Sequence, residues 1–147
     1  MTLKQNPLLD LYNEGKQFEQ TTKQVEIEIR SKQISFTIRP QNYDDMSRLA
    51  VARARISNAM RDNDGLDAEG LHGEIMLDMV IRCTLEFSDL LDDEIQESGA
   101  ESKVDFVKTA LGAYGVTQLY NHIQQFTDSA TEKQEDEVFE IGEEIKN

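Results

Sequence analysis

Side chains able to act as nucleophiles or bases are few in this sequence, and their spacing forms no catalytic set. Cys83 is the only cysteine among 147 residues, and the only histidines are His72 and His122. A cysteine nucleophile needs a base to take its proton, but Cys83 falls on the apolar stripe of an expected helix, which is typical of a buried structural cysteine. The sequence also lacks the glycine patterns of a P-loop or a dinucleotide-binding turn.

Acidic side chains that could bind a metal also lack the necessary partners. A zinc site needs three or four ligands, and only His72 lies near Glu74 and Asp78 at a suitable spacing. Residues 62–65 resemble part of a calcium loop, but the position that requires a carboxylate holds Leu71. We therefore predict no catalytic residues, no metal site and no cofactor, and a protein that is not an enzyme.

The charge of the chain disfavours several classes of partner. Its 15 basic and 29 acidic residues give a net charge of −14. Such a surface repels nucleic-acid phosphates and anionic lipids, and no apolar run approaches the roughly 20 residues that span a bilayer. The acids concentrate in residues 66–101 and 132–147. We predict no nucleic-acid and no membrane partner, and a location in a reducing cytoplasm, because one cysteine forms no internal disulfide.

The elements that must position any functional surface begin with a strong alternation of apolar and polar residues. Alternation with period two places the apolar residues on one face of a strand. A short polar gap at residues 31–33 separates two such segments, and Pro40 ends the second. We predict a β-hairpin over residues 25–39. Its apolar face consists of Val25, Ile27, Ile29, Ile34, Phe36 and Ile38.

After the hairpin, the apolar residues follow a helical period. Asn42 is a suitable N-cap for a helix that starts near Tyr43, and Asp44 and Asp45 favour its first turn. Further helices are predicted over residues 67–96 (with a break near 87–89), 104–111 and 116–126. Before the hairpin, residues 7–19 can form a short helix that Gly15 weakens.

The order of these elements predicts an α+β fold that is predominantly helical. An N-terminal β-hairpin is followed by a bundle of about four to five helices and a mobile acidic C-terminal tail. Residues 1–131 form a single α+β domain, with the hairpin at 25–39 and helices from 43 on. Residues 132–147 form an acidic flexible tail.

Two apolar segments are candidates for binding partner proteins. An isolated hairpin is marginal in water and leaves an unpaired strand edge, so it either packs on its own helices or pairs with another chain. The second alternative makes the six apolar hairpin residues partner-binding sites and predicts a homo-oligomer. In the tail, an apolar hook can become ordered on a partner, or the tail is simply disordered. The hook consists of Val138, Phe139 and Ile141.

This layout resembles the tail assembly chaperones of long-tailed bacteriophages. Those proteins are small, acidic and mainly helical, often with a short β element before the helices. The alternating stretch over residues 25–40, followed by a helix from Tyr43, looks like their N-terminal part. The charged ending over residues 132–147 is similar to their C-termini.

The resemblance implies a function and a set of partners. Such a chaperone binds the tape measure protein, which is long and helical, and helps recruit tail tube subunits around it. It works in the host cytoplasm and is absent from the mature virion. Apolar helix faces would cover the client, while negative charge would keep the complex dispersed.

Two other functions remain open from the residues. Acidic side chains can imitate DNA phosphates and inhibit a host nucleic-acid-binding protein, which the acidic run over residues 86–101 favours. Against this, residues 1–65 and 102–131 are nearly neutral, so the charge does not follow a duplex-like path. A small structural adaptor of the virion is the other alternative.

Overall fold

The computed structural model describes the backbone of residues 7–146 and the side chains of residues 7–129. This part of the chain contains six helices and one two-stranded antiparallel sheet. In chain order, the elements are α1 (Pro7–Glu19), β1 (Lys23–Ile29), β2 (Lys32–Ile38), α2 (Tyr43–Arg61), α3 (Gly65–Cys83), α4 (Leu85–Ser88), α5 (Asp92–Ser98) and α6 (Lys103–Lys146). The predicted helical α+β class with an N-terminal hairpin is confirmed, with six helices rather than four or five.

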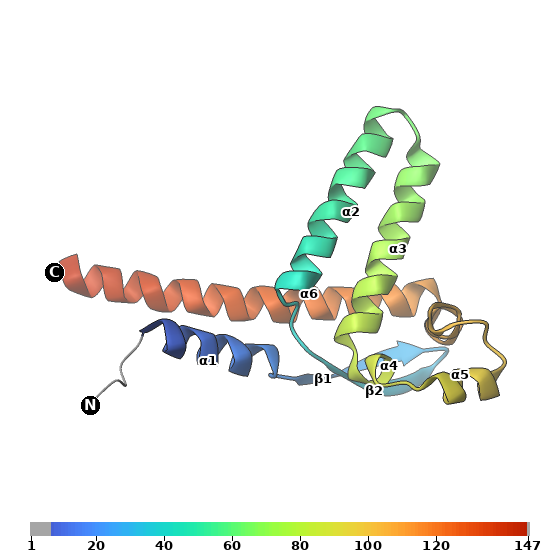
Figure 1. Ribbon diagram of the computed structural model, residues 1–147, viewed down its shortest axis with the longest axis horizontal. Helices are drawn as coiled ribbons and strands as arrows, with labels where there is room; N and C mark the ends of the chain where they lie inside the picture. The colour runs from blue at the N-terminus through green and yellow to red at the C-terminus, as the bar shows by residue number, and fades with distance from the viewer. Residues whose placement is uncertain (1–6, 147) are drawn as a thin grey trace.

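The long helix α6 organises the molecule. Figure 1 shows it running across the whole structure, with the sheet on one side and α2 and α3 projecting from the other. We call this antiparallel pair of helices, residues 43–83, the arm. Helix α1 lies toward the end at which α6 finishes, whereas α4 and α5 lie near the start of α6 (Figure 1).

The two strands pair through a tight turn. Arg30 and Ser31 form it with φ angles of 48° and 67°, as two-residue hairpin turns of the mirror-image type require. The turn therefore starts one residue earlier than the polar gap at 31–33 predicted. The Arg30 Nη2 donates a hydrogen bond of 2.9 Å to the backbone oxygen of Ala110, which holds the turn against α6.

The apolar face of the hairpin forms one wall of the hydrophobic core. The Phe36 ring meets the Phe87 ring of α4 with centroids 5.4 Å apart. Gly115 of α6 lies so close to Ile29 that a Cβ there would be 3.7 Å from the isoleucine side chain. Buried side chains from α3 and α6 complete the wall opposite the sheet: Val80, Cys83, Val107, Leu111, Val116, Leu119 and Ile123.

The outer edge of β2 is closed by the junction between α3 and α4. The backbone N–H of Thr37 donates to both carboxylate oxygens of Glu86, at 2.7 and 3.0 Å. The backbone N–H of Arg39 donates to the Cys83 carbonyl at 2.9 Å. Thr84 forms a single antiparallel bridge with Ile38. The junction thus takes the place of a third strand along part of this edge.

That bridge explains why the helix predicted over residues 67–96 is divided. Thr84 has an extended backbone, with φ −108° and ψ 114°, and is fully buried. Helix α3 therefore ends at Cys83, earlier than the break expected near residues 87–89. The short helices α4 and α5 follow, and Gly99 ends α5 in the left-handed conformation, with φ 83°.

The two helices predicted over residues 104–111 and 116–126 are parts of α6. They join across a kink at Gly112, where φ is 69° and ψ is 171°. The backbone of residues 132–146 continues α6, but the side chains of the predicted flexible tail lie outside the described residues. No described helix is both long enough and apolar enough to cross a membrane.

Candidate functional site

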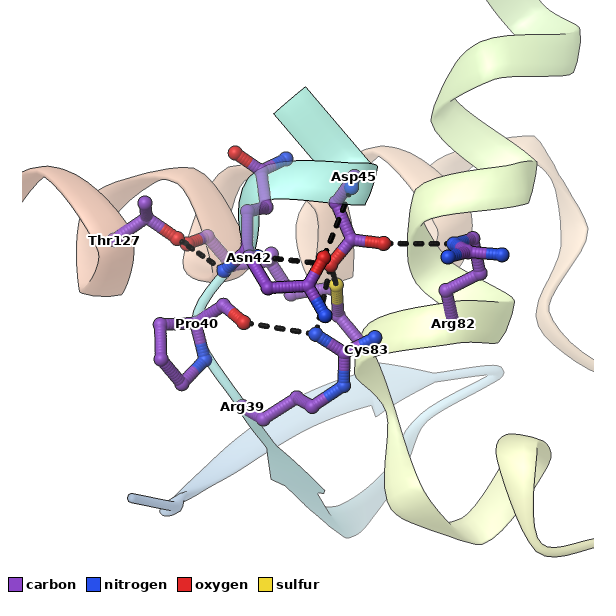
Figure 2. Close-up of polar contacts among 9 residues, drawn as sticks. Arg39, Pro40, Asn42, Asp45, Arg82, Cys83 and Thr127 are labelled. Carbon is purple, nitrogen blue, oxygen red and sulfur yellow. Dashed lines mark hydrogen bonds and ion pairs between the residues drawn. The ribbon is translucent and has the colours of Figure 1, made fainter. Parts of the chain in front are cut away.

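A buried carboxylate, Asp45, joins three separate segments at the base of the arm (Figure 2). Its Oδ2 accepts a hydrogen bond of 2.7 Å from Nη1 of Arg39, which follows β2. Its Oδ1 accepts one of 2.7 Å from Nε of Arg82, in the last turn of α3. The Asp45 side chain is fully buried, whereas the two arginine side chains are partly exposed. This arrangement fixes where the arm leaves the base.

The same carboxylate also completes the N-terminal cap of α2. The Asn42 side chain accepts a hydrogen bond from the backbone of Asp45 at 2.9 Å, and Asp45 accepts one from the backbone of Asn42 at 3.0 Å. This reciprocal capping box satisfies two backbone donors that a helix start leaves unpaired. The predicted cap at Asn42 and helix start at Tyr43 are confirmed. Next to this cap, the Gln41 backbone N–H donates to Thr127 Oγ1 of α6 at 3.0 Å.

The hydrogen bonds around Asp45 favour the charged forms of Asp45 and Arg82. Burial raises the pKa of Asp45, but hydrogen bonds from Arg39, from the Asn42 backbone and from Arg82 outweigh burial and hold the pKa below its usual value. The Asp45 carboxylate in turn raises the pKa of Arg82. The lowered pKa of Asp45 and the raised pKa of Arg82 both favour the ionised forms at neutral pH, which suits a structural role rather than proton transfer.

Cys83 lies beneath Asp45 and is unsuited to nucleophilic chemistry. Its Sγ is 3.7 Å from Asp45 Oδ2, and its side chain is fully buried. Burial, together with the nearby carboxylate, raises the pKa of the Cys83 thiol to about 12. A reactive cysteine needs a lowered pKa and access to solvent. Among the described residues, no group of three or more histidine, cysteine or carboxylate side chains could hold a metal ion.

Five of the six apolar hairpin residues predicted to bind partners are buried inside this chain. These five lie in one core cluster with α3, α4 and α6: Val25, Ile27, Ile29, Phe36 and Ile38. Ile34 is set apart from them, with 36% of its surface exposed. The alternative in which the hairpin packs on its own helices is therefore the arrangement seen. The side chains of Val138, Phe139 and Ile141 lie outside the described residues.

An apolar groove of about 520 Å³ lies between α3 and the first part of α6. Its apolar lining comes from Met76, Leu77, Val104 and Val116. Small residues widen it on both sides: Gly70, Gly73, Gly112 and Ala113. One charged residue stands on each wall, Glu74 on α3 and Lys108 on α6. Val104 is 52% exposed, so an apolar partner can reach the groove. We call it the α3–α6 groove.

A second cavity, of about 490 Å³, lies within the arm between α2 and α3. Charged residues from both helices line it: Arg48, Arg55, Glu74 and Asp78. Arg48 and Asp78 form an ion pair of 3.6 Å at this place. The arginines of α2 thus face acids of α3, so this cavity is less suited to an apolar partner than the α3–α6 groove.

The sequence identified only part of the Asp45 cluster and did not identify the α3–α6 groove. Asp45 was expected only to favour the first turn of a helix, because Arg82 lies 37 residues away and Arg39 lies six residues earlier, outside that helix. One signal was available: Arg82 interrupts an apolar stripe directly before Cys83, and an arginine at such a position needs a partner. The groove had no local signal, since Val104 and Leu77 meet only after α3 and α6 have packed together.

No protein family, no curated protein and no solved structure matches this chain.

Proposed function

We propose that the chain is a non-enzymatic tail assembly chaperone, which binds amphipathic helical segments of the tape measure protein and helps recruit tail tube subunits. The observation that supports this function best is the α3–α6 groove, which is apolar, open and lined on both walls by helices. Grooves of this kind accept the apolar face of a partner helix. The resemblance in layout supplies the identity of the client.

The residues of the groove suit a helical client. A client helix presents apolar side chains at positions i, i+3, i+4 and i+7. Met76 can adapt its shape to different side chains, which matters for a client whose sequence varies along its length. Gly73 and Ala113 allow the client backbone to approach closely. Glu74 and Lys108, on opposite walls, would favour one orientation of the client over the other.

The charge distribution suits a protein that must keep an apolar client dispersed. The segment over residues 85–101 carries seven acids and no base. It lies on α4, α5 and their flanking loops, near the start of α6 (Figure 1). A complex coated with such chains repels other complexes of the same kind.

The same acidic segment favours a second candidate, an inhibitor that imitates DNA. Against this candidate, residues 46–61 of α2 carry four arginines and no acid. Arg53, Arg55 and Arg61 are exposed and form no ion pair within the described part of the chain. An acidic surface that could imitate phosphates therefore does not extend over residues 46–61 of α2. A competition assay separates the candidates, because a DNA mimic displaces duplex DNA from its host target and a chaperone does not.

Co-expression with the tape measure protein of the same phage tests the first candidate. We expect the wild-type chain to keep that protein soluble and to co-purify with it. Val104→Asp and Ala113→Glu place charges in the groove at exposed positions, so both should reduce the co-purified amount at least about tenfold. An acid in the first turn of α6 suits the helix dipole, so Val104→Asp should fold normally.

Tyr114→Glu is the matched control, because Tyr114 is 70% exposed beside Ala113 but does not line the groove. It should co-purify the client as well as the wild type does. Equal recovery by the groove variants and the wild type, with all chains folded, would reject the groove as the client site.

A further inference from the structure

Helix α1 presents an apolar face that this chain leaves in solvent. It contains no buried residue. Its large apolar side chains are mostly exposed: Leu8 by 74%, Leu9 by 54%, Leu11 by 62% and Tyr12 by 60%. A helix of 13 residues is marginal in water without tertiary packing. A surface that packs on α1 would therefore stabilise it.

The α3–α6 groove has the apolar character that α1 needs, and its longer wall is comparable with α1 in length. A helix of 13 residues is about 20 Å long. The α6 wall runs over residues 104–117, with a kink at Gly112, and the α3 wall runs over residues 70–77. Figure 1 shows α1 at the end of the molecule where α6 finishes, away from the start of α6 that lines the groove. Only residues 20–22 connect α1 to β1, and they span at most about 11 Å.

Charges on α1 and on the groove are complementary. Lys16 and Glu14 lie on opposite flanks of the apolar stripe of α1, given 100° per residue. The Lys16 Nζ lies 5.5 Å from the centre of the Tyr12 ring, which places it at the border of that stripe. The walls of the groove carry the opposite charges, Glu74 on one side and Lys108 on the other. One orientation of α1 therefore pairs Lys16 with Glu74 and Glu14 with Lys108.

The area available favours two such contacts rather than one. An aromatic side chain such as Tyr12 contributes on the order of 150–250 Å² and a leucine less, so the exposed parts of these four side chains offer at most roughly 450 Å². With an equal area on the groove and its rims, one contact buries about 900 Å², below the roughly 1,200–2,000 Å² of stable interfaces. Two contacts bury about 1,800 Å², within that range.

We propose that the chain forms a two-fold symmetric dimer, in which α1 of each copy occupies the α3–α6 groove of the other. Each copy then contributes both a helix and a groove, as a self-complementary interface requires. The dimer is independent of any client, and its tests contain none. If the groove also accepts a client helix, α1 of the second copy competes with that helix.

Molar mass in solution tests the proposal first. The full chain should be a dimer by light scattering or sedimentation. Leu11→Glu combined with Tyr12→Glu should weaken the dimer at least about tenfold, and so should Ala113→Glu. All three positions are exposed, so the variants should keep the wild-type circular dichroism. Leu66→Glu and Tyr114→Glu are controls, at positions 85% and 70% exposed outside both surfaces, and should remain dimers.

A charge exchange tests the pairing across the groove. Lys16→Glu and Glu74→Lys should each weaken the dimer roughly threefold to tenfold, because each breaks two symmetric pairs near the surface. A chain that carries both substitutions should regain most of the lost affinity. Failure of the double variant to recover, when both single variants weaken the dimer, would contradict the proposed orientation.

Cross-linking tests which copies are joined. A chain with Leu11→Cys and Ala113→Cys should form disulfides between two chains, whereas Leu11→Cys with Tyr114→Cys should not. Cys83 should not interfere, because it is fully buried. A wild-type monomer at all concentrations, or a disulfide within one chain, would overturn the proposal. So would a dimer that survives the groove variants but is lost when residues 132–147 are removed.

Discussion

At the scale of single residues, Asp45 has the largest number of partners. Its carboxylate accepts hydrogen bonds from Arg39 at the end of the hairpin and from Arg82 at the end of α3, and it also caps α2. Farther along the arm, α2 and α3 are also joined by the ion pair between Arg48 and Asp78. Asp45 is the point at which the end of the hairpin, the end of α3 and the start of α2 meet through charged side chains. The orientation of the arm relative to the sheet therefore depends in part on this side chain.

Replacing this carboxylate should destabilise the protein in a pH-dependent way. Asp45→Asn leaves two arginines without their anion, and we expect a loss of about 3 kcal/mol at neutral pH, since both are partly exposed. Folding lowers the pKa of Asp45. The unfolded chain therefore binds more protons below about pH 4, and the stabilisation is lost as the pH falls through the folded pKa.

Urea unfolding between about pH 6 and about pH 3 measures this effect. The difference in unfolding free energy between the wild type and Asp45→Asn should shrink as the pH falls. Asp44→Asn is a suitable control, because Asp44 is exposed and should give a difference near zero. A difference that stays constant with pH would show that Asp45 does not contribute through its charge.

The sequence predicted part of this cluster because part of it is local. The cap at Asn42 involves residues three apart, and cap preferences depend on such short spacings. The pairing of Asp45 with Arg82 joins residues 37 apart. No local preference reports such a contact, since it forms only when α3 folds back along α2. The buried position of the apolar hairpin residues follows from the same packing.

At the scale of elements, the kink in α6 determines how the first part of this helix meets α3. Gly112 has φ 69° and ψ 171°, a conformation that is essentially restricted to glycine. Residues on both sides of the kink line the α3–α6 groove, Val104 before it and Val116 after it. Residues on both sides also pack in the core with the hairpin, Leu111 before the kink and Leu119 after it. The direction of α6 changes between the contacts made before the kink and those made after it.

A side chain at this glycine should therefore be costly. Gly112→Ala should lower the unfolding free energy by about 1–3 kcal/mol, although no atom lies within 4 Å of the new Cβ. The strain comes from the backbone alone. Gly65→Ala is the control, because Gly65 also has open space and has no positive φ; it should change stability by less than about 0.5 kcal/mol. Equal melting curves for the two variants would contradict the need for glycine at 112.

The glycine positions and the spacing of apolar residues predicted which helices and strands form better than they predicted where these elements end. The helices on each side of Gly112 were predicted, since glycine punctuates a helical pattern. The end of α3 was placed too late, because Thr84 leaves the helix to pair with Ile38 of the sheet. The turn at Arg30 and Ser31 was missed by one residue, because neither residue type favours a positive φ. In both cases a tertiary contact decides the boundary.

At the scale of the whole molecule, the described core ends before the acidic C-terminal residues. Among the side chains that the structure describes, which extend to residue 129, the last buried ones on α6 are Ile123 and Thr127. We predict that deletion of residues 132–147 leaves the melting temperature unchanged within about 2 °C, because no described core residue is removed. The far-UV circular dichroism should lose only the helical signal of the removed part. A thermal melt of the two chains measures both quantities.

A longer deletion provides the contrast. Removal of residues 122–147 also takes away Ile123, which is fully buried in the core, and should cost at least about 2–5 kcal/mol. If the shorter deletion already abolishes cooperative unfolding, residues 132–147 belong to the core and the boundary at 131 is wrong.

The closed edge of β2 has a consequence for how the protein behaves when crowded. A bare strand edge invites other chains to add strands and grow into fibrils. Here the backbone N–H of Thr37 already donates to the Glu86 carboxylate, and the backbone N–H of Arg39 already donates to the Cys83 carbonyl. An incoming strand would have to displace a negative charge as well as a backbone contact. Over that part of the edge, the small sheet is thereby protected against the addition of a further strand.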